Sequence, residues 1–409
     1  MSDTKLGTRF QEIQAKSEKY LLGNYARSPV AFEYGVGDLL FDTEGRRYID
    51  FLCGISVTNL GHSEADIIDA LRDQADKLFH TSNLFYSAEQ ANLAEVIVEN
   101  SFPGKVFFCN SGTEANEAAF KLIRKYAVAK GISQPIVLTL KGSFHGRTMG
   151  SMSLTGQTKI HEGFGDLVPG VDYIEQNDTV HLDFLFSKYK GRVVGVFAEP
   201  ILGEYGVIPL EEHFLLALRK LTQENGAILV LDEIQTGIGR TGKLFCYQHY
   251  PIQPDLMTLA KGLGNGFPIG ALVVGNNFTE YLPVGAHGST FGGNHLATRV
   301  AYETLRVILS RDILASVPAL SEFLVRKLKM MKATYPKIIK EIRGIGLHIG
   351  VELFIPSKPI VQECLQKGLV VNSTNERFIR IMPPLNTSIE RIHEAMEILE
   401  NVLSGVKIE

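Results

Sequence analysis

The sequence GAILVLDE, residues 226–233, contains an unbroken apolar run that ends on two carboxylates. The preceding residues, 211–225, have the composition of a helix, and Gly226 is of the residue type that commonly follows a helix C-terminus. Because successive positions of the run are apolar, both faces of the strand are expected to be buried, as in a parallel sheet covered by helices on each side. The stretch therefore predicts an α/β fold.

The same pattern recurs through the middle of the chain. Short runs of β-branched and aliphatic residues alternate with longer amphipathic stretches, such as residues 114–130. This alternation is typical of α/β proteins with a mostly parallel sheet. The runs predicted as strands are residues 105–109, 135–140, 193–197, 227–231, 256–260 and 269–274.

The two ends of the chain have a different pattern. Residues 41–51 are predicted to form a hairpin with its turn at Glu44–Gly45. From Tyr302 the sequence predicts a long helical stretch, then strands near residues 347–353 and 377–382, and a last helix from Ser388. We expect a large domain over residues 71–300 and a smaller α+β domain that combines residues 1–70 with residues 301–409.

Composition excludes several classes of protein. The 409 residues are 45% hydrophobic and 21% charged, which excludes wholesale disorder. A net charge of -4 without a basic tract argues against nucleic-acid binding, and no apolar run reaches the ~18 residues of a membrane span. The first residues lack the apolar segment of a secretory signal, and the four cysteines are far apart with no CxxC pair. We therefore expect the protein in the cytoplasm.

Three of the strand-like runs end on ionisable residues, namely Glu199, Asp232 and Lys261. Ligands of open α/β sheets bind at the carboxyl ends of the strands, so these side chains are expected to converge. A lysine amine in a dry site becomes neutral and nucleophilic, and it can form a Schiff base with a carbonyl group. A carboxylate such as Asp232 could then face the protonated ring nitrogen of pyridoxal phosphate.

Each of these residues also has an ordinary structural interpretation. Lys261 fits a strand-end lysine that extends to solvent, and Asp232 fits a carboxylate that caps the next turn. Their occurrence together, on apolar strands about one βαβ unit apart, favours the catalytic interpretation.

The sequence FFCNSGTEANE, residues 107–117, predicts a strand, a polar turn and a helix. The N–H groups at the helix start and the hydroxyls of Ser111 and Thr113, on either side of Gly112, predict an anion site. The same residues fit a capping box in which Ser111 and Glu114 start the helix. Glu114 would repel a phosphate unless its side chain turns away.

Three further segments contain candidate binding residues. In GSFHGRT, residues 142–148, Phe144 could stack on a ring and Arg147 could bind a carboxylate. Arg380 lies inside an apolar strand and needs an anion, although an ordinary salt bridge would satisfy either arginine. Residues 285–294, which include Ser289 and Thr290, are too polar for a core and fit a second phosphate contact or a flexible connection.

Two nucleotide-binding motifs fail in context. The sequence GIGRTG, residues 237–242, matches GxGxxG, but Pro251 and Pro254 make the following segment non-helical, whereas the motif should open a helix. A P-loop needs Ser or Thr after its lysine, and Leu244 follows Lys243. The motifs of serine hydrolases and metalloproteases do not occur in the sequence.

From about Asn24 to its end, the chain resembles the class III pyridoxal-phosphate aminotransferases of fold type I. The blocks that carry the resemblance include FFCNSGTEANEAAFKLIRKY, FHGRTMGSMSLTGQ, EPILGEYGV, LDEIQTGIGRTG, DLMTLAKGLGNGFPIGA, HGSTFGGN and IRIMPPL. Within that family, the members that act on N2-acetylornithine are the most similar. The resemblance implies a large domain with a mostly parallel sheet, a smaller α+β domain, and a homodimer whose active site lies at the interface.

The resemblance also implies roles for individual residues. Lys261 would carry the cofactor covalently and move a proton, Asp232 would keep the ring nitrogen protonated, and Gln235 would reach the ring hydroxyl. Phe144 would stack on the ring, while Ser111, Gly112, Thr113 and the partner subunit's Thr290 would bind the phosphate. Arg380 would bind the α-carboxylate of glutamate, Arg147 the distal carboxylate, and Glu199 would pair with Arg380 as a switch. Tyr25, Ile55 and Ser289 would complete the substrate site.

The expected reaction is transfer of the ω-amino group of N2-acetylornithine to 2-oxoglutarate in arginine biosynthesis. The apolar Ile55 suits an acylated amine, because it offers no partner to a buried ammonium group. The segments near Ser63, Leu202 and Tyr205 depart from the family's usual sequence. Close alternatives are N-succinyl-diaminopimelate, 4-aminobutyrate or free ornithine as the amine. Rivals from other classes are a nucleotide-dependent enzyme that uses residues 237–242, and a non-catalytic binding protein of this fold.

Overall fold

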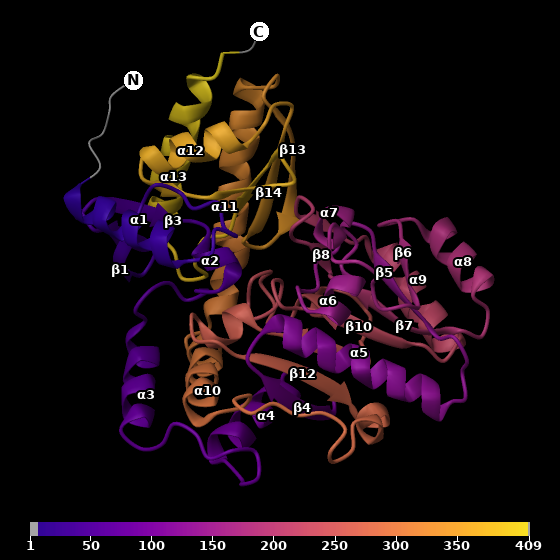
Figure 1. Ribbon diagram of the computed structural model, residues 1–409. Helices are drawn as coiled ribbons and strands as arrows, with labels where there is room; N and C mark the ends of the chain where they lie inside the picture. The colour runs from indigo at the N-terminus through magenta and orange to yellow at the C-terminus, as the bar shows by residue number, and fades with distance from the viewer. Residues whose placement is uncertain (1–6, 408–409) are drawn as a thin grey trace.

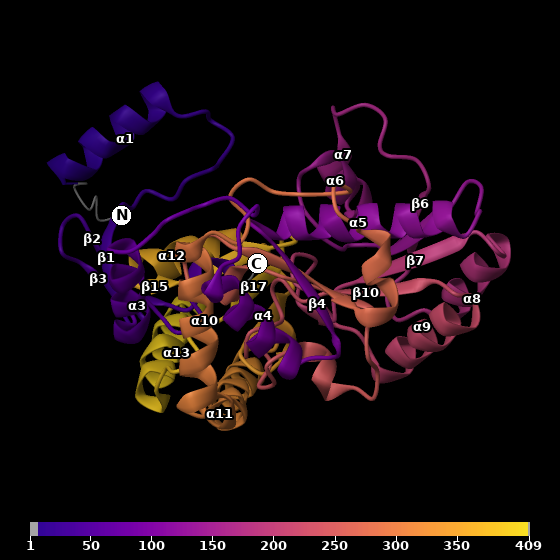
Figure 2. The same cartoon turned by 90° about the horizontal axis from the view of Figure 1, so that it is seen from below.

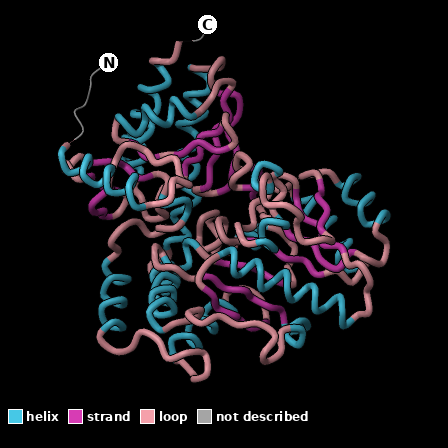
Figure 3. Tube along the Cα trace, in the orientation of Figure 1, coloured by secondary structure: helices cyan, strands magenta, loops and turns pink. Residues whose placement is uncertain are grey.

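The computed structural model describes residues 7–407 and contains a large α/β part and a smaller part built from both ends of the chain (Figure 1). Figure 3 shows that both parts contain strands and helices. None of the helices within residues 7–407 is long and apolar enough to span a membrane.

The large part is organised around a seven-stranded sheet. Its order is β4-β12-β11-β10-β7-β5-β6, and the pairings of β10 with β11 and β7, and of β5 with β7 and β6, are parallel. Every residue of β7, β10 and β11 is buried, as the apolar runs predict. The strands are β4 (Gly104–Cys109), β5 (Ile136–Leu140), β6 (Val171–Ile174), β7 (Val193–Ala198), β10 (Ile228–Asp232), β11 (Leu256–Leu259) and β12 (Gly270–Gly275).

One strand of this sheet runs against the others. β12 is antiparallel to both of its neighbours, β11 and β4. The connection from Leu259 to Gly270 is too short for the crossover helix that a parallel pair requires. The predicted apolar run is therefore a strand, but the sheet is mixed at this edge.

Helices cover both faces of the sheet. Figure 2 shows α5 on one face and α8 and α9 on the other. The helices of this part are α4 (Ala88–Glu99), α5 (Gly112–Ala129), α6 (Met149–Leu154), α7 (Thr158–His161), α8 (Thr179–Lys188), α9 (Glu212–Glu224) and α10 (His295–Ser310). Shorter elements are the hairpin β8 (Ile201–Leu202) and β9 (Ile208–Pro209), and the 3-10 turns η1 (Cys246–His249), η2 (Lys261–Gly264) and η3 (Asn276–Tyr281).

The smaller part joins the two ends of the chain. In the sheet β1-β2-β3-β15, the last strand comes from the C-terminal region and pairs in parallel with β3. A second sheet has the order β13-β14-β17-β16. The strands are β1 (Phe32–Val36), β2 (Leu39–Asp42), β3 (Arg47–Asp50), β13 (Ile339–Ile345), β14 (His348–Leu353), β15 (Leu369–Val370), β16 (Asn372–Thr374) and β17 (Phe378–Ile381). The helices of this part are α1 (Thr8–Tyr20), α2 (Cys53–Ser56), α11 (Ile313–Thr334), α12 (Lys358–Gln366) and α13 (Ile389–Ser404), while α3 (Ala65–Ala75) packs against α10 of the large part.

The long helical stretch predicted from Tyr302 differs from the structure. It begins earlier, at His295, where the Asn294 side chain accepts a hydrogen bond from the backbone N–H of Ala297. It is also interrupted, because Asp312 has a left-handed φ of 49° and separates α10 from α11. The cap at Asn294 and the interruption at Asp312 depend on local backbone conformation, so the spacing of apolar residues does not predict them.

The glycine-rich segment 237–242 contributes to the junction between the two parts. Arg240 is fully buried and donates to Ser56 Oγ at 3.0 Å, to Asn59 Oδ1 at 2.6 Å and to the carbonyl oxygens of Leu347 and Pro383. The segment is followed by the short η1 turn instead of an α-helix. The segment therefore holds a buried structural arginine and lacks the helix that a GxGxxG nucleotide site needs.

Candidate active site

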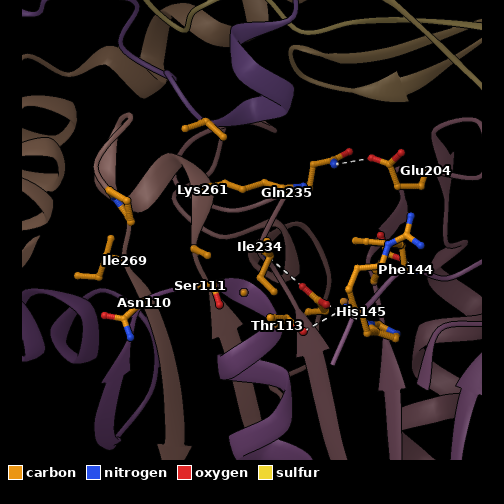
Figure 4. A pocket seen from close by; sticks show the side chains of 18 of the residues that line it. Asn110, Ser111, Thr113, Phe144, His145, Glu204, Ile234, Gln235, Lys261 and Ile269 are labelled. Carbon is orange, nitrogen blue, oxygen red and sulfur yellow. Dashed lines mark hydrogen bonds and ion pairs between the residues drawn. The ribbon is translucent and has the colours of Figure 1, made fainter. Parts of the chain in front are cut away.

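A cavity of about 430 Å³ lies at the carboxyl ends of β7, β10 and β11, beside the start of α5 (Figure 4). Most of the predicted site residues line it. In Figure 4, Lys261 and Gln235 lie on one side and Ser111 and Thr113 on the opposite side. The predicted residues among its lining are Ser111, Gly112, Thr113, Phe144, Arg147, Glu199, Asp232, Gln235 and Lys261.

Lys261 follows β11 and begins η2 with a left-handed φ of 45°. Burial lowers the pKa of the Lys261 amine below the ordinary lysine value. The positive charge of Arg380 lowers this pKa further, while the carboxylates of Glu204 and Asp232 partly oppose the shift. A larger fraction of the amine is therefore neutral than at an exposed lysine, which makes it a better nucleophile and proton acceptor.

Asp232 ends β10 and is held by three donors. Its Oδ2 contacts Asn116 Nδ2 at 2.8 Å and His145 Nδ1 at 2.7 Å, and its Oδ1 accepts from the backbone N–H of Ile234 at 3.0 Å. Only 3% of Asp232 is exposed. The three contacts fix the carboxylate and stabilise its negative charge at the cavity wall.

Sequence reasoning missed Asn116 and His145 as partners of Asp232. Asn116 is fully buried inside α5, and a buried amide among the mostly apolar buried residues of this helix needs a polar partner. The position of Asn116 on the apolar face of the predicted helix was the signal from which a polar partner could have been predicted. No comparable signal in the sequence indicates His145, whose contact with Asp232 spans 87 positions.

The start of α5 forms the other wall. The Ser111 hydroxyl accepts from the backbone N–H of Glu114, whose carboxylate in turn accepts from the N–H of Asn110 at 2.6 Å. The capping-box interpretation is therefore confirmed, and it is compatible with the predicted anion site, because Glu114 is bound within the cap while Ser111, Gly112 and Thr113 line the cavity. A Cβ on Gly112 would lie 2.6 Å from Ile234 Cδ1, so a larger residue at this position would displace the Ile234 side chain.

Glu199 binds backbone groups at the cavity. Its Oε1 accepts from the N–H of Phe144 at 2.7 Å and its Oε2 from the N–H of Gly203 at 3.3 Å. Burial, and after it the charge of Asp232, raises the pKa of Glu199 to about 7, against the opposing effects of His145 and these two N–H groups. Glu199 thus fixes the loop that carries Phe144 and Arg147, and the Arg147 guanidinium lies 5.6 Å from the centre of the Phe144 ring.

The expected pairing of Glu199 with Arg380 is wrong. Arg380 is fully buried, and its Nη1 contacts Glu204 Oε1 at 2.5 Å. Burial alone would raise the pKa of Glu204, but Arg380 and Lys261 outweigh that effect and lower it. The two glutamates lie on either side of the β8 strand, so their side chains reach different parts of the site.

The remaining contacts of Arg380 are neutral. Its Nη1 also donates to Gln235 Oε1 and to the carbonyl oxygen of Gly203, both at 3.1 Å, and its Nε donates to Asn372 Oδ1 at 3.1 Å. Gln235 Nε2 donates to Glu204 at 3.3 Å. Glu204 therefore carries the negative charge that neutralises Arg380 in this chain.

Five predicted residues lie outside the cavity lining as residues 7–407 define it, and one of them is the buried Arg380. Tyr25 is 70% exposed, and Ile55 lies in the α2 turn next to Val57, which does line the cavity. Thr290 is exposed, and Ser289 Oγ accepts from the backbone N–H of Gly292 within its own loop.

The cavity fits pyridoxal phosphate. Lys261 offers an amine to the aldehyde, Asp232 a fixed negative charge to the ring nitrogen, and the start of α5 N–H and hydroxyl groups to the phosphate. Phe144 and Ile234 offer apolar surfaces to the ring. Gly112 lines the cavity and has no side chain that would cover the first N–H groups of α5.

Comparisons with known proteins agree with this chemistry. Residues 23–403 match the family model described as aminotransferase class-III. The chain is 44% identical to the acetylornithine aminotransferase of Caldanaerobacter subterraneus subsp. tengcongensis over 392 residues, which cover 95% of this chain and 98% of that protein.

Two solved structures have closely similar folds. An ornithine aminotransferase from Toxoplasma gondii, with partial occupancy of PLP at its active site, superposes with a TM-score of 0.92 at 31% identity and covers 98% of this chain and 95% of its own. The N-acetylornithine aminotransferase of Stenotrophomonas maltophilia superposes with a TM-score of 0.82 at 37% identity and covers 95% of this chain and 98% of its own.

Proposed function

The chain belongs to the class III aminotransferases, and from that membership we propose that it transfers the ω-amino group of N2-acetylornithine to 2-oxoglutarate. The products are N-acetylglutamate 5-semialdehyde and glutamate, and the reaction belongs to arginine biosynthesis. Its cofactor is pyridoxal phosphate. The observation that carries the proposal is that Arg147 and Glu204 both line the cavity while Glu204 pairs with Arg380, because this arrangement offers two sites for carboxylates, one of which can be neutralised.

Each of the cavity residues has a separate role in the proposed reaction. Bound pyridoxal phosphate supplies the aldehyde that exchanges amino groups and a ring that accepts electrons. Lys261 Nζ removes the proton from the carbon that bears the substrate's amino group. In the reverse half-reaction, the same amine gives a proton back to that carbon. Asp232 keeps the ring nitrogen protonated, and Ser111, Gly112 and Thr113 bind the phosphate.

The two substrates use the arginines differently. Glutamate has two carboxylates, so Arg380 binds the α-carboxylate after Glu204 moves aside and Arg147 binds the distal one. In N2-acetylornithine the carbon that bears the ω-amino group carries no carboxylate. The single carboxylate of this substrate, at the α-carbon, binds Arg147. Glu204 then stays on Arg380, so that no buried guanidinium is left without an anion.

The variant Glu204→Gln is expected to slow the acetylornithine half-reaction by about 10-fold, because breaking a buried pair leaves the Arg380 charge uncompensated. The glutamate half-reaction should change by less than about threefold, since glutamate neutralises Arg380 itself. Stopped-flow absorbance of the cofactor measures each half-reaction separately.

The control is Glu199→Gln, which alters a carboxylate in the same segment that does not touch Arg380. It should slow both half-reactions to a similar extent. Equal slowing of both half-reactions by Glu204→Gln would show that Glu204 is not the switch.

A screen of amino donors tests the substrate directly. We expect the largest kcat/KM with N2-acetylornithine, and lower values with free ornithine, N-succinyl-diaminopimelate and 4-aminobutyrate. The apolar Ile55, in the turn before Val57, supports an acylated amine because it cannot stabilise a free α-ammonium group. A clear preference for ornithine would refute this choice of substrate.

We also propose that the enzyme is a homodimer in the cytoplasm. Segment 78–86 exposes several large apolar side chains, and such patches mark protein interfaces. Its Asn83 donates to the carbonyl oxygens of Ser289 and Gly292, which places the patch beside Thr290. The four free, buried cysteines suit a reducing compartment. The exposed residues are Leu78, Phe79, Leu84, Phe85 and Tyr86, with Phe291 nearby.

Subunit mixing is expected to restore activity if the partner's Thr290 completes each site. Lys261→Ala and Thr290→Asp subunits should each be inactive alone, the second because a carboxylate repels the phosphate. A mixed dimer contains one site with an intact lysine and an intact threonine, so activity should reappear after joint refolding. A monomeric mass by light scattering, or no activity in the mixture, would contradict the shared site.

A further inference from the structure

The Arg147 side chain lines the cavity without a charged partner. Within residues 7–407 its guanidinium forms no ion pair, and it lies 5.6 Å from the centre of the Phe144 ring. A long side chain without such a partner takes its direction from the backbone that carries it. The contacts that fix this backbone therefore decide how the guanidinium meets a carboxylate in the cavity.

Three side chains on one face of α5 hold the segment around Arg147. They occupy positions 113, 116 and 117, which share a helix face because they are three and four residues apart. Thr113 Oγ1 accepts from the backbone N–H of Arg147 at 3.2 Å. Asn116 Nδ2 donates to the carbonyl oxygen of His145 at 2.7 Å. The segment is therefore attached to the same helix whose first residues line the cavity.

Glu117 makes the attachment that lies farthest along this segment. Its Oε1 accepts from the backbone N–H of Gly150 at 2.8 Å and from that of Ser151 at 3.3 Å. These N–H groups belong to the first turn of α6, which packs against α5 and starts two residues after Arg147. The N-cap residue of α6, Thr148, forms no cap hydrogen bond with its side chain. Glu117 supplies the missing cap, and its negative charge suits the positive end of the helix dipole.

Gly150 makes room for the Glu117 carboxylate. A Cβ on Gly150 would lie 2.3 Å from Glu117 Oε2. Gly150 lies inside α6 and is absent from the positions with positive φ, so its backbone conformation does not itself require glycine. Glu117 is not among the residues that line the cavity. Its influence on a ligand must therefore pass through the start of α6 and Arg147.

We propose that Glu117 is a positioning residue for the substrate: it fixes the start of α6, and through it the direction in which Arg147 presents its guanidinium. This proposal rests on the proposed function, in which Arg147 binds the carboxylate of N2-acetylornithine and the distal carboxylate of glutamate. Loss of the cap should weaken the binding of both substrates. The chemical step should change little, because Glu117 contacts neither Lys261 nor Asp232.

The experiment measures the apparent Kd and the limiting rate of the half-reaction with N2-acetylornithine, glutamate and L-alanine. Glu117→Ala should raise the apparent Kd about fivefold for the first two donors, which reach Arg147, and change their limiting rates by less than about twofold. The apparent Kd for L-alanine should stay within about twofold of the wild-type value, because its single carboxylate binds Arg380. Glu117→Gln should restore tight binding, since one oxygen makes both backbone contacts and an amide retains it.

Gly150→Ala disturbs the same contact from the other side. The added methyl group would displace the Glu117 carboxylate, so the apparent Kd should rise as in Glu117→Ala. In the double variant the methyl group meets no carboxylate, and it should add less than about twofold to the effect of Glu117→Ala.

Asp178→Ala is the matched control. The Asp178 carboxylate accepts from the backbone N–H of His181 at 2.8 Å and so caps the start of α8, outside the cavity. Its loss should lower the midpoint of thermal unfolding and leave the apparent Kd and the limiting rate of every donor unchanged.

The variant Arg147→Met separates this proposal from the one on which it rests. It should raise the apparent Kd for N2-acetylornithine and glutamate about tenfold or more, because a hydrogen bond between charged groups is lost. An unchanged Kd in Arg147→Met would overturn both proposals. A large effect of Arg147→Met with none of Glu117→Ala would overturn only the positioning by Glu117. Equal weakening of L-alanine by Glu117→Ala would also overturn it, since that result indicates a general disturbance of the site.

Discussion

Replacing Lys261 by alanine is expected to lower kcat on the order of 10⁴-fold or more, because both the covalent attachment and the proton transfer depend on its amine. The structure leaves no substitute at the same place, since Lys261 is the one lysine that lines the cavity within residues 7–407. The fold should persist, because the change removes a buried amine without leaving an unpaired charge. Overall turnover, and the absorbance of the cofactor in each half-reaction, measure the effect.

The matched control is Lys243→Ala. Lys243 is the lysine of the P-loop-like sequence, is exposed and lies outside the cavity, so its loss should leave turnover within about twofold of the wild type, as is usual for surface substitutions. In an enzyme that depended on a nucleotide site at residues 237–243, Lys243→Ala would lower turnover more than Lys261→Ala. Retention of turnover by Lys261→Ala would refute its role.

The second large effect is expected for Asp232→Asn, which should lower kcat on the order of 10³-fold, since it removes a fixed charge that stabilises the reacting system. A neutral amide cannot keep a proton on the ring nitrogen. It also preserves only part of the contacts that Asp232 makes with Asn116 and His145. Both half-reactions should slow, in contrast with the selective effect of Glu204→Gln. The cofactor's absorbance spectrum should shift as well, because the ring nitrogen loses its proton.

Asp255→Asn is a suitable control for this variant. Asp255 lies at the opposite end of β11, where it accepts from the backbone N–H of Leu229 and pairs with Arg219. Its replacement should lower stability, measured by thermal unfolding, and leave kcat and the spectrum nearly unchanged. A normal spectrum and near-normal kcat in Asp232→Asn would show that this carboxylate does not face the ring nitrogen.

The sequence was sufficient to predict six of the seven strands of the large sheet, all but β6, and the position of the site for a simple physical reason. Strands buried on both faces are continuous apolar runs, and a charged residue at the end of such a run must have a partner or a function. Glu199, Asp232 and Lys261 are such residues, and all three line one cavity. The antiparallel direction of β12 depends instead on the length of one connection.

Other features required coordinates because they depend on contacts between distant segments. Glu199 and Glu204 occur in the same short segment, and only their three-dimensional placement shows that Glu204 contacts Arg380 while Glu199 binds backbone N–H groups. The contact of His145 with Asp232 is likewise tertiary. The position of Glu114 outside the cavity lining follows from its cap, in which its carboxylate accepts from the backbone N–H of Asn110.

Reductive trapping tests the covalent role of Lys261 most directly. Borohydride reduces the double bond between a lysine amine and the aldehyde of pyridoxal phosphate, which fixes the cofactor to the residue that carried it. Peptide mapping by mass spectrometry is expected to find the label on the peptide that contains Lys261, and to find none there in Lys261→Ala. A label on another lysine, or an unlabelled wild-type protein, would contradict the assignment.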